Sequence, residues 1–175
     1  MKYLLSVALL LLAAALPAEP RILDWEELIP AGWPPEDLFA DIDPDEIAML
    51  EDDDPKAIEF FSRIEAVWDQ APMVAELDGE QIRLPGYAIP LEGDGERVTS
   101  FLLVPYYGAC IHVPPPPRNQ TVLVTMSGDR TARIRQAFAT VWVTGTMTVE
   151  AGETELAMTG YTLHAEQVAP YEDSL

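Results

Sequence analysis

In the C-terminal part of the chain, from about Leu77 onward, apolar residues recur at every second position. Ile82 and Leu84 follow this alternation, and a Pro85-Gly86 pair then interrupts it. Beyond this pair the apolar residues fall on the opposite parity, at Tyr87, Ile89 and Leu91. Because strand side chains alternate between two faces, the pattern predicts a half-buried β-strand, and the change of parity predicts a β-bulge that bends it.

Four further segments carry the signature of a strand, which is alternation or a short apolar run between turn residues. The expected strands lie within 77–91 and at Val98–Val104, Thr121–Met126, Thr140–Glu150 and Tyr161–Val168. Between the third and fourth strands, Thr131 to about Ala137 is expected to form a short helix. This arrangement favours a mainly β fold, a five-stranded OB-like barrel of the oligonucleotide- and oligosaccharide-binding type. An open β-sandwich is the alternative.

The most specific stretch of the chain runs from Phe101 to Gln120. It begins as an apolar strand and continues through two tyrosines to Cys110, the only cysteine, and His112. Four consecutive prolines follow: Pro114, Pro115, Pro116 and Pro117. Consecutive prolines favour a stiff polyproline II segment with a solvated backbone.

Three stretches of the sequence resemble a family of small exported bacterial proteins known as domain of unknown function 3299 (DUF3299). They are Leu23–Pro30, Leu84–Leu91 and Cys110–Pro117, within a resemblance that extends from Leu23 to Tyr171. The chain departs from the family in carrying Arg118 where a fifth proline is usual. The family name supplies no reaction. The resemblance implies export and a gene setting beside metal-responsive and ABC-transporter genes.

The first 18 residues are typical of a secretory signal peptide. Lys2 precedes an apolar stretch from Tyr3 to Leu16, and small residues follow, with cleavage expected after Ala15 or Ala18. A membrane anchor is the alternative, but the stretch is shorter than the ~20 apolar residues that a spanning helix needs. We therefore expect a periplasmic protein with no transmembrane segment in the mature chain.

Acidic residues dominate the composition. The chain has 30 Asp and Glu against 10 Lys and Arg, a formal net charge of -20. Such a charge repels phosphate backbones, so we expect no nucleic acid among the partners. The acids concentrate at positions 19–76, which we expect to form an acidic helical arm. This arm carries several large apolar residues and should therefore dock on the barrel domain at 77–175.

One helix of the arm is expected to start at Asp54-Pro55 and to run to about Asp69. Its residues at helical spacing should face the core: Ile58, Phe61, Ile64 and Trp68. An earlier helix start lies at Asp43-Pro44. The acids around it resemble the start of a calcium loop but lack its glycine, so helix capping is the favoured explanation.

Cys110 and His112 form the candidate metal site. Two positions apart on an extended segment, their side chains leave the same face. Thiolate and imidazole are ligands of zinc and copper. His164, a carboxylate or the Asn119 carbonyl could complete the set if barrel closure brings them near. The alternatives are a buried structural cysteine beside a hydrogen-bonded histidine, and a Cys–His or zinc-dependent enzyme.

The Tyr- and Pro-rich loop is the second candidate site, because a stiff polyproline surface suits an aromatic groove of a partner. The residues expected to contact a partner are Tyr106, Tyr107, Pro114, Pro115, Pro116, Pro117, Asn119 and Gln120. The sequence thus favours an exported, non-catalytic binding or accessory protein that binds metal or assists a membrane transporter. Its partner would be a periplasmic or inner-membrane protein. An enzyme, or a structural module that uses this loop alone, is the alternative.

Overall fold

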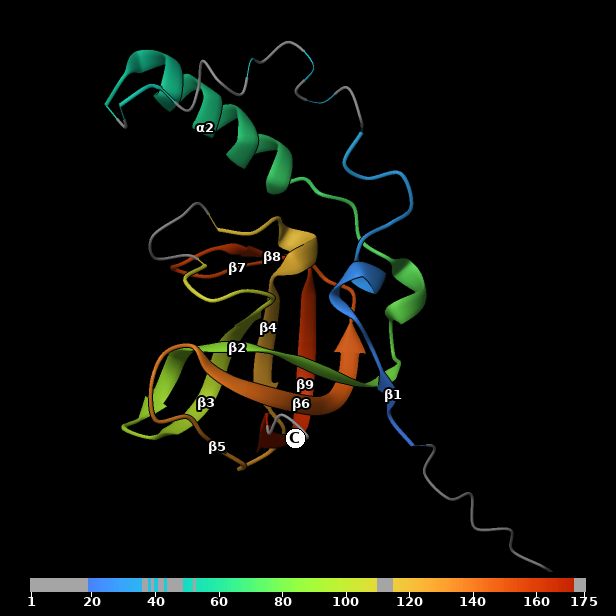
Figure 1. Cartoon of the computed structure of the whole chain (residues 1–175). Coiled ribbons are helices and arrows are strands. Elements are labelled where there is room, and N and C mark those ends of the chain that lie inside the picture. Colours follow the sequence, from blue (N-terminus) through green and yellow to red (C-terminus); the bar gives the residue numbers. More distant parts are fainter. Residues whose placement is uncertain are drawn as a thin grey trace, which may run out of the picture.

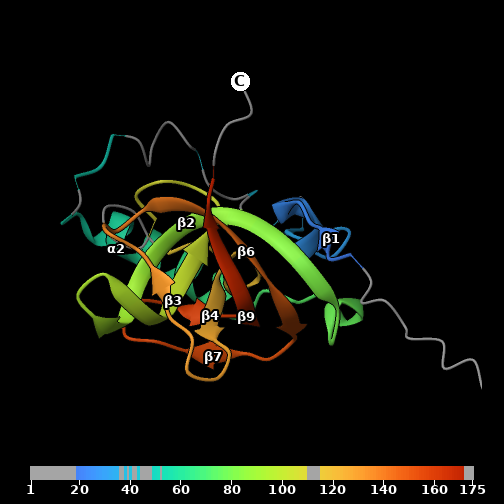
Figure 2. The same cartoon turned by 90° about the horizontal axis from the view of Figure 1, so that it is seen from below.

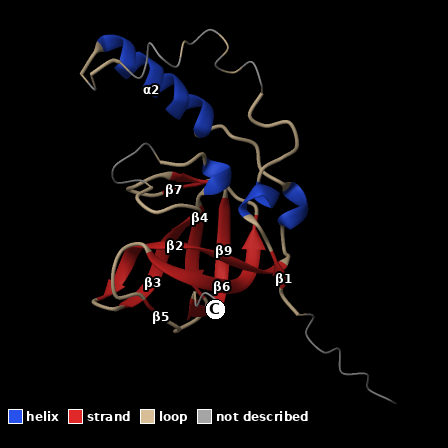
Figure 3. Cartoon of the chain, in the orientation of Figure 1, coloured by secondary structure: helices blue, strands red, loops and turns tan. Residues whose placement is uncertain are grey.

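Five strands close into a barrel in the computed structural model of this chain (Figures 1 and 3). The structure describes residues 19–35, 38, 40, 43, 49–51, 53–109 and 115–171. The barrel strands are β2 (Gln81–Asp94), β3 (Arg97–Val104), β4 (Val122–Met126), β6 (Ala139–Thr148) and β9 (Tyr161–Pro170). They pair in the order β2-β3-β4-β9-β6, and β6 returns to β2. All of these pairs are antiparallel except β4 with β9. The predicted mainly β, five-stranded fold is confirmed.

Short strands extend the barrel. β1 (Arg21–Ile22) pairs in parallel with β2, and β5 (Ala132–Arg133) pairs with the start of β3. β7 (Gly152–Glu153) and β8 (Met158–Thr159) form a separate two-stranded sheet in the connection from β6 to β9.

The helix expected from Thr131 to about Ala137 does not form, and this connection contains β5 instead. Ala132 and Ile134 are buried, whereas Arg133 and Arg135 are exposed. This is the period of a strand, and the extended backbone places both apolar side chains in the core. The barrel therefore closes without the short helix that was expected between the third and fourth strands. Because that helix was one reason to expect an OB-like barrel, the OB-like assignment remains a prediction.

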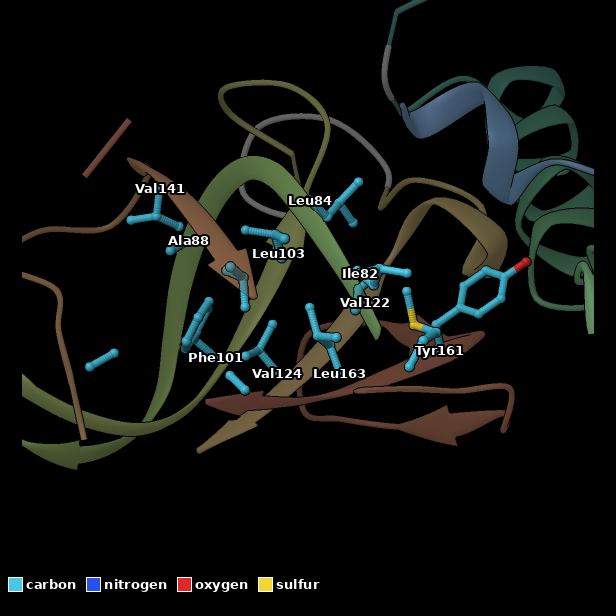
Figure 4. Close-up of a cluster of buried hydrophobic side chains, with 14 of the residues drawn as sticks. Ile82, Leu84, Ala88, Phe101, Leu103, Val122, Val124, Val141, Tyr161 and Leu163 are labelled. Carbon is cyan, nitrogen blue, oxygen red and sulfur yellow. The ribbon is translucent and has the colours of Figure 1, made fainter. Parts of the chain in front are cut away.

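The main core fills the barrel (Figure 4). Its fully buried side chains include Ile82, Leu84, Phe101, Leu103, Val122, Val124, Tyr161 and Leu163. Leu23 and Leu28 of the N-terminal arm are fully buried in the same cluster. Gly86 permits a close approach here, since a Cβ at this position would lie 2.8 Å from Leu103 and 3.0 Å from Trp25.

A second apolar cluster lies on the outer side of the barrel wall. Its buried members are Ile89, Leu102, Val104, Ala109, Phe138 and Ala157. The β-bulge expected at Pro85-Gly86 is wrong, because β2 pairs with β6 in unbroken register from Gln81 to Ala88. The apolar parity changes along β2 because Tyr87 and Ile89 pack in the outer cluster, while Ala88 faces the main core. The register shifts of β2 lie between Pro90 and Gly93.

The N-terminal arm contains the short helix η1 (Trp25–Leu28), the helix α2 (Pro55–Trp68) and the short helix η2 (Ala75–Leu77). The start and end of α2 match the prediction. Asp54 caps the helix, because its side chain accepts a hydrogen bond from the Lys56 backbone N–H. Figure 1 shows α2 set apart from the barrel strands.

The apolar stripe expected on α2 is only partly buried. Ile64 is buried, but Ile58 is 54% exposed and Phe61 is 37% exposed. The buried line runs through Ala57 and Ile64, which share one face of the helix because they are two turns apart. Ile58 follows Ala57 directly, so its side chain is rotated by about 100° around the helix axis and points toward solvent.

Two predictions for the N-terminal part of the chain fall on residues that the structure does not describe. They are the signal peptide at 1–18 and the helix start at Asp43-Pro44, of which only Asp43 is described. Within the described ranges, no helix has both the length and the apolar character needed to span a membrane.

Candidate ligand-binding cleft

The predicted metal ligands are placed only in part. Cys110 and His112 lie outside the described residues. His164 lies on β9 with its side chain exposed, and its Nδ1 is 3.1 Å from the Thr125 hydroxyl on β4. Among the residues that the structure describes, no three His, Cys, Asp or Glu side chains gather as a metal site would require. Zinc or copper binding by Cys110, His112 and His164 stays a prediction.

The Tyr- and Pro-rich loop packs against the outer apolar cluster. The Tyr107 ring lies 4.9 Å from the Phe138 ring and 6.1 Å from the Tyr87 ring, between centroids. Tyr107 is nevertheless 72% exposed. Its ring therefore contacts the outer apolar cluster while most of the side chain remains in solvent. Tyr106 is also exposed.

The prolines of this loop differ in exposure. Pro116 is buried, and Pro115 and Pro117 are half-buried, while Pro114 lies outside the described residues. The described end of the proline run is therefore packed onto the protein rather than projecting into solvent.

The residues after the prolines form the short helix η3 (Arg118–Gln120), and their side chains hold the N-terminal arm. Arg118 Nε donates to the Ala71 carbonyl at 2.7 Å, and Asn119 Nδ2 donates to the Pro72 carbonyl at 3.0 Å. Gln120 Nε2 donates to the Trp25 carbonyl at 2.7 Å. Asn119 is fully buried. The two amide side chains that were expected to contact a partner are thus engaged within the molecule.

A cleft of about 770 Å³ lies between the barrel wall and the β7–β8 hairpin. Strands β2, β3 and β4 supply one side and the hairpin supplies the other. The lining residues are Leu91, Glu92, Ser100, Leu123, Thr125, Glu153, Thr154 and Glu155. Figure 1 shows the hairpin beside η3, at the end of the barrel where β4 begins, and Figure 2 shows β7 near β4 from below.

The hairpin wall of the cleft is held by its own turn and by the barrel. Thr154 Oγ1 donates to the Ala157 carbonyl at 2.9 Å and accepts from the Ala157 backbone N–H at 3.1 Å. Ala157 is itself buried in the outer apolar cluster. The Gly160 N–H, just after β8, donates to the Arg118 carbonyl at 2.7 Å. The hairpin is therefore held at its turn and again just after β8, and this places Glu153 and Glu155 at the cleft.

Ser100 is the most enclosed polar residue of the cleft. It pairs across the strands with Thr125, while the next residue, Phe101, points into the main core. Because strand side chains alternate, the Ser100 hydroxyl points outward into the cleft. Ser100 is only 9% exposed, and its hydroxyl has no hydrogen-bond partner within the described part of the chain.

Sequence reasoning missed this cleft, although weak signals were present. Ser100 is a small polar residue directly before the apolar run Phe101–Val104. Glu153 and Glu155 flank a threonine in a tight turn. Neither signal indicates that the two segments meet, because the barrel alone brings them together.

The sequence profile of one family, described as proteins of unknown function (DUF3299), matches residues 25–170. This chain belongs to the DUF3299 family. The match spans the barrel, the cleft and most of the arm, and it confirms the resemblance seen in the sequence. No curated protein matches the chain.

A solved relative shares the fold. The crystal structure of a DUF3299 family protein from Pseudomonas aeruginosa is 40% identical to this chain, with a TM-score of 0.65. The match covers 90% of this chain and 99% of the other.

Proposed function

We propose that this DUF3299 protein is an exported, non-catalytic binding protein of the periplasm. It holds its ligand in the cleft between β2–β3–β4 and the β7–β8 hairpin, and it assists a periplasmic or inner-membrane protein.

The observation that carries this proposal is the Ser100 hydroxyl, which has no described partner and lies inside a cleft of about 770 Å³. Ligand sites typically have volumes of roughly 300–1,000 Å³ and a few converging polar groups on an apolar surface. The Ser100 hydroxyl is open to the cleft, so a bound ligand can become its hydrogen-bond partner in place of solvent.

The position of the cleft gives further support. In barrels of the OB type, ligands bind on the face formed by the second and third strands, beside the loop between the fourth and fifth strands. Here β3 and β4 are the second and third barrel strands, and the β7–β8 hairpin lies between the fourth and fifth. This argument is one of fold analogy and names no ligand.

We favour binding over catalysis because of Thr125 and His164. Among the described residues, this is the one hydroxyl–imidazole pair at the cleft, and it is open to solvent. Thr125 and His164 lie 3.1 Å apart, as such a pair requires, but the His164 side chain is exposed on the barrel surface. Catalytic sites normally exclude water around the reacting groups.

Site-specific photocrosslinking in bacteria that express the full chain tests the proposal. A crosslinker at Glu155, on the cleft wall, is expected to capture a periplasmic or membrane component. A matched crosslinker at Asp129, which is exposed but outside the cleft lining, is the control. Equal capture from both positions, or none from Glu155, would contradict the proposal.

Export is tested separately by cell fractionation. We expect the chain in the periplasm to begin at Leu16 or Glu19, because a signal peptidase removes roughly 15–18 residues. Cytoplasmic protein with an intact N-terminus would rule out this part of the proposal.

A further inference from the structure

We infer that the cleft binds an aliphatic ammonium group, carried either by a free polyamine or by a lysine side chain of a partner. This inference rests on the proposed binding function and names the class of ligand that the same cleft takes.

The first argument is charge. Glu92, Glu153 and Glu155 line the cleft, and the described lining contains no basic residue. None of the three forms an ion pair with a described basic residue. Some other acids have such a partner, since Glu96 lies 2.9 Å from Arg133 and Glu80 lies 3.1 Å from Arg21, but many do not in a chain with 30 acidic and 10 basic residues. What sets the three cleft carboxylates apart is that they gather at one cleft with no counter-ion from the described residues.

The second argument is the enclosed hydroxyl, which is independent of the acids. An ammonium group has three N–H donors and needs three acceptors. The Ser100 hydroxyl points into the cleft and has no described partner, although the residue as a whole is nine-tenths buried. Thr125 lies beside it on the same face. When one N–H of the ammonium group bonds to a carboxylate, these two hydroxyl oxygens can accept hydrogen bonds from its other N–H groups.

The apolar part of the lining distinguishes a carbon-bearing cation from a metal ion. Leu91 and Leu123 are half-buried against the outer apolar cluster and line the cleft. Such leucines suit the methylene chain of a polyamine or lysine, which packs along apolar surface while its charged end reaches polar groups. The cleft carboxylates are not among any group in the described residues that could hold a metal.

The absence of aromatic rings from the described lining narrows the ligand further. Nucleobases, sugars and guanidinium groups commonly stack on Trp, Tyr or Phe. No described residue of the cleft lining is aromatic. A flexible, unbranched ammonium chain requires no such platform.

Isothermal titration of the mature protein with spermidine tests the inference. We expect saturable binding of one spermidine per chain at physiological ionic strength. Magnesium ion at matched ionic strength serves as the control for general attraction to an acidic protein, because the net charge of -20 gathers any cation weakly.

Matched variants locate the site. The cleft variant Glu92→Gln/Glu153→Gln/Glu155→Gln should bind spermidine about tenfold more weakly, as expected for the loss of three partly exposed ion pairs. The control variant Asp69→Asn/Glu76→Gln/Asp129→Asn removes the same charge from exposed positions outside the cleft and should change affinity by less than about twofold. Equal weakening in both variants would overturn the inference.

The Ser100→Ala variant tests the enclosed hydroxyl without any change of charge. Its affinity for spermidine should fall by about threefold to tenfold, in line with one lost hydrogen bond to a charged group. Because the Ser100 hydroxyl makes no hydrogen bond within the described fold and is open to the cleft, thermal unfolding of Ser100→Ala is expected to match the wild type. Unchanged affinity would contradict the role of Ser100.

A second titration distinguishes the two sources of the ammonium group. If the ligand is a lysine of a partner, N-acetyl-lysine amide or a short lysine peptide should bind and be weakened by the cleft variant. If it is a free polyamine, spermidine should bind and the lysine compounds should not. If neither class binds while crosslinking from Glu155 still captures a component, this inference fails and the proposed binding function stands.

Discussion

One buried hydroxyl joins two separate parts of the N-terminal arm to the barrel. Tyr161, on β9, is fully buried, and its hydroxyl donates to the Leu28 carbonyl at 2.7 Å. The same oxygen accepts a hydrogen bond from the Val74 backbone N–H at 2.8 Å. Figure 4 shows the ring among the core side chains, with its oxygen directed toward the arm. Burial raises the pKa of Tyr161 above its usual 10.0, although the Val74 N–H opposes this rise.

The variant Tyr161→Phe should lower the free energy of unfolding by about 1–3 kcal/mol near neutral pH, because the Leu28 carbonyl and the Val74 N–H lose a partner. The pH dependence has a definite sign. The raised pKa means that the folded state keeps the phenol proton above pH 10, where the unfolded chain releases it, so this contribution to stability falls as pH rises past 10.

Urea unfolding of the wild type and Tyr161→Phe across pH 7–11 measures this effect. The difference in unfolding free energy between the two proteins should narrow above pH 10. A difference that stays constant or widens with pH would show that the tyrosine is not protonated preferentially in the folded protein.

At the scale of elements, the arm contributes to the barrel core. β1 adds a parallel strand to β2, and Leu23 and Leu28 are buried with the barrel residues. Trp25 donates from its indole Nε1 to the Pro85 carbonyl at 2.7 Å. The residues next to β1 and in η1 are therefore integral to the fold, whereas α2 exposes Ile58 and Phe61.

The variant Leu23→Ala should destabilise the protein by about 2–5 kcal/mol, since it leaves a cavity in the main core. The matched variant Ile58→Ala, at an exposed position of α2, should change stability by less than about 0.5 kcal/mol. Equilibrium unfolding followed by tryptophan fluorescence measures both. Similar values for the two variants would contradict the view that the residues next to β1 stabilise the fold more than the exposed face of α2 does.

The strands could be predicted from the sequence better than the outer apolar cluster and the cleft that lie against them. Alternation at Ile82 and Leu84 and the apolar run Phe101–Val104 follow directly from side-chain geometry, so these strands are visible in the sequence. The outer cluster is not, because an apolar residue on either face of a strand gives the same local pattern; Tyr87 and Ile89 therefore suggest a bulge where the register is unbroken. The cleft joins Ser100 to Glu153, and no local pattern encodes a contact over that separation.

The whole molecule carries a large excess of negative charge. The formal net charge is -20 at pH 7, and the sequence pI is about 4.1. Like charges repel one another in the compact state more than in the expanded chain, so this excess opposes folding. The described ion pairs that could offset it are exposed, among them Arg21 with Glu80 and Arg133 with Glu96. Exposed ion pairs contribute only about 0–1 kcal/mol each.

Sodium chloride should therefore raise the melting temperature at pH 7. Salt screens repulsion among many carboxylates over distances beyond a Debye length, about 30 Å at 0.01 M and about 10 Å at 0.1 M. It also weakens the few exposed ion pairs, but the excess of acids makes repulsion the larger effect. Thermal unfolding between about 0.01 and 0.2 M salt measures the balance, with chloride rather than sulfate as the anion, because sulfate strengthens apolar burial as well. Near pH 4.1, where the net charge vanishes, the same salt series should leave the melting temperature almost unchanged. A melting temperature that falls with salt at pH 7 would instead mean that attraction within the exposed ion pairs outweighs repulsion among the acids.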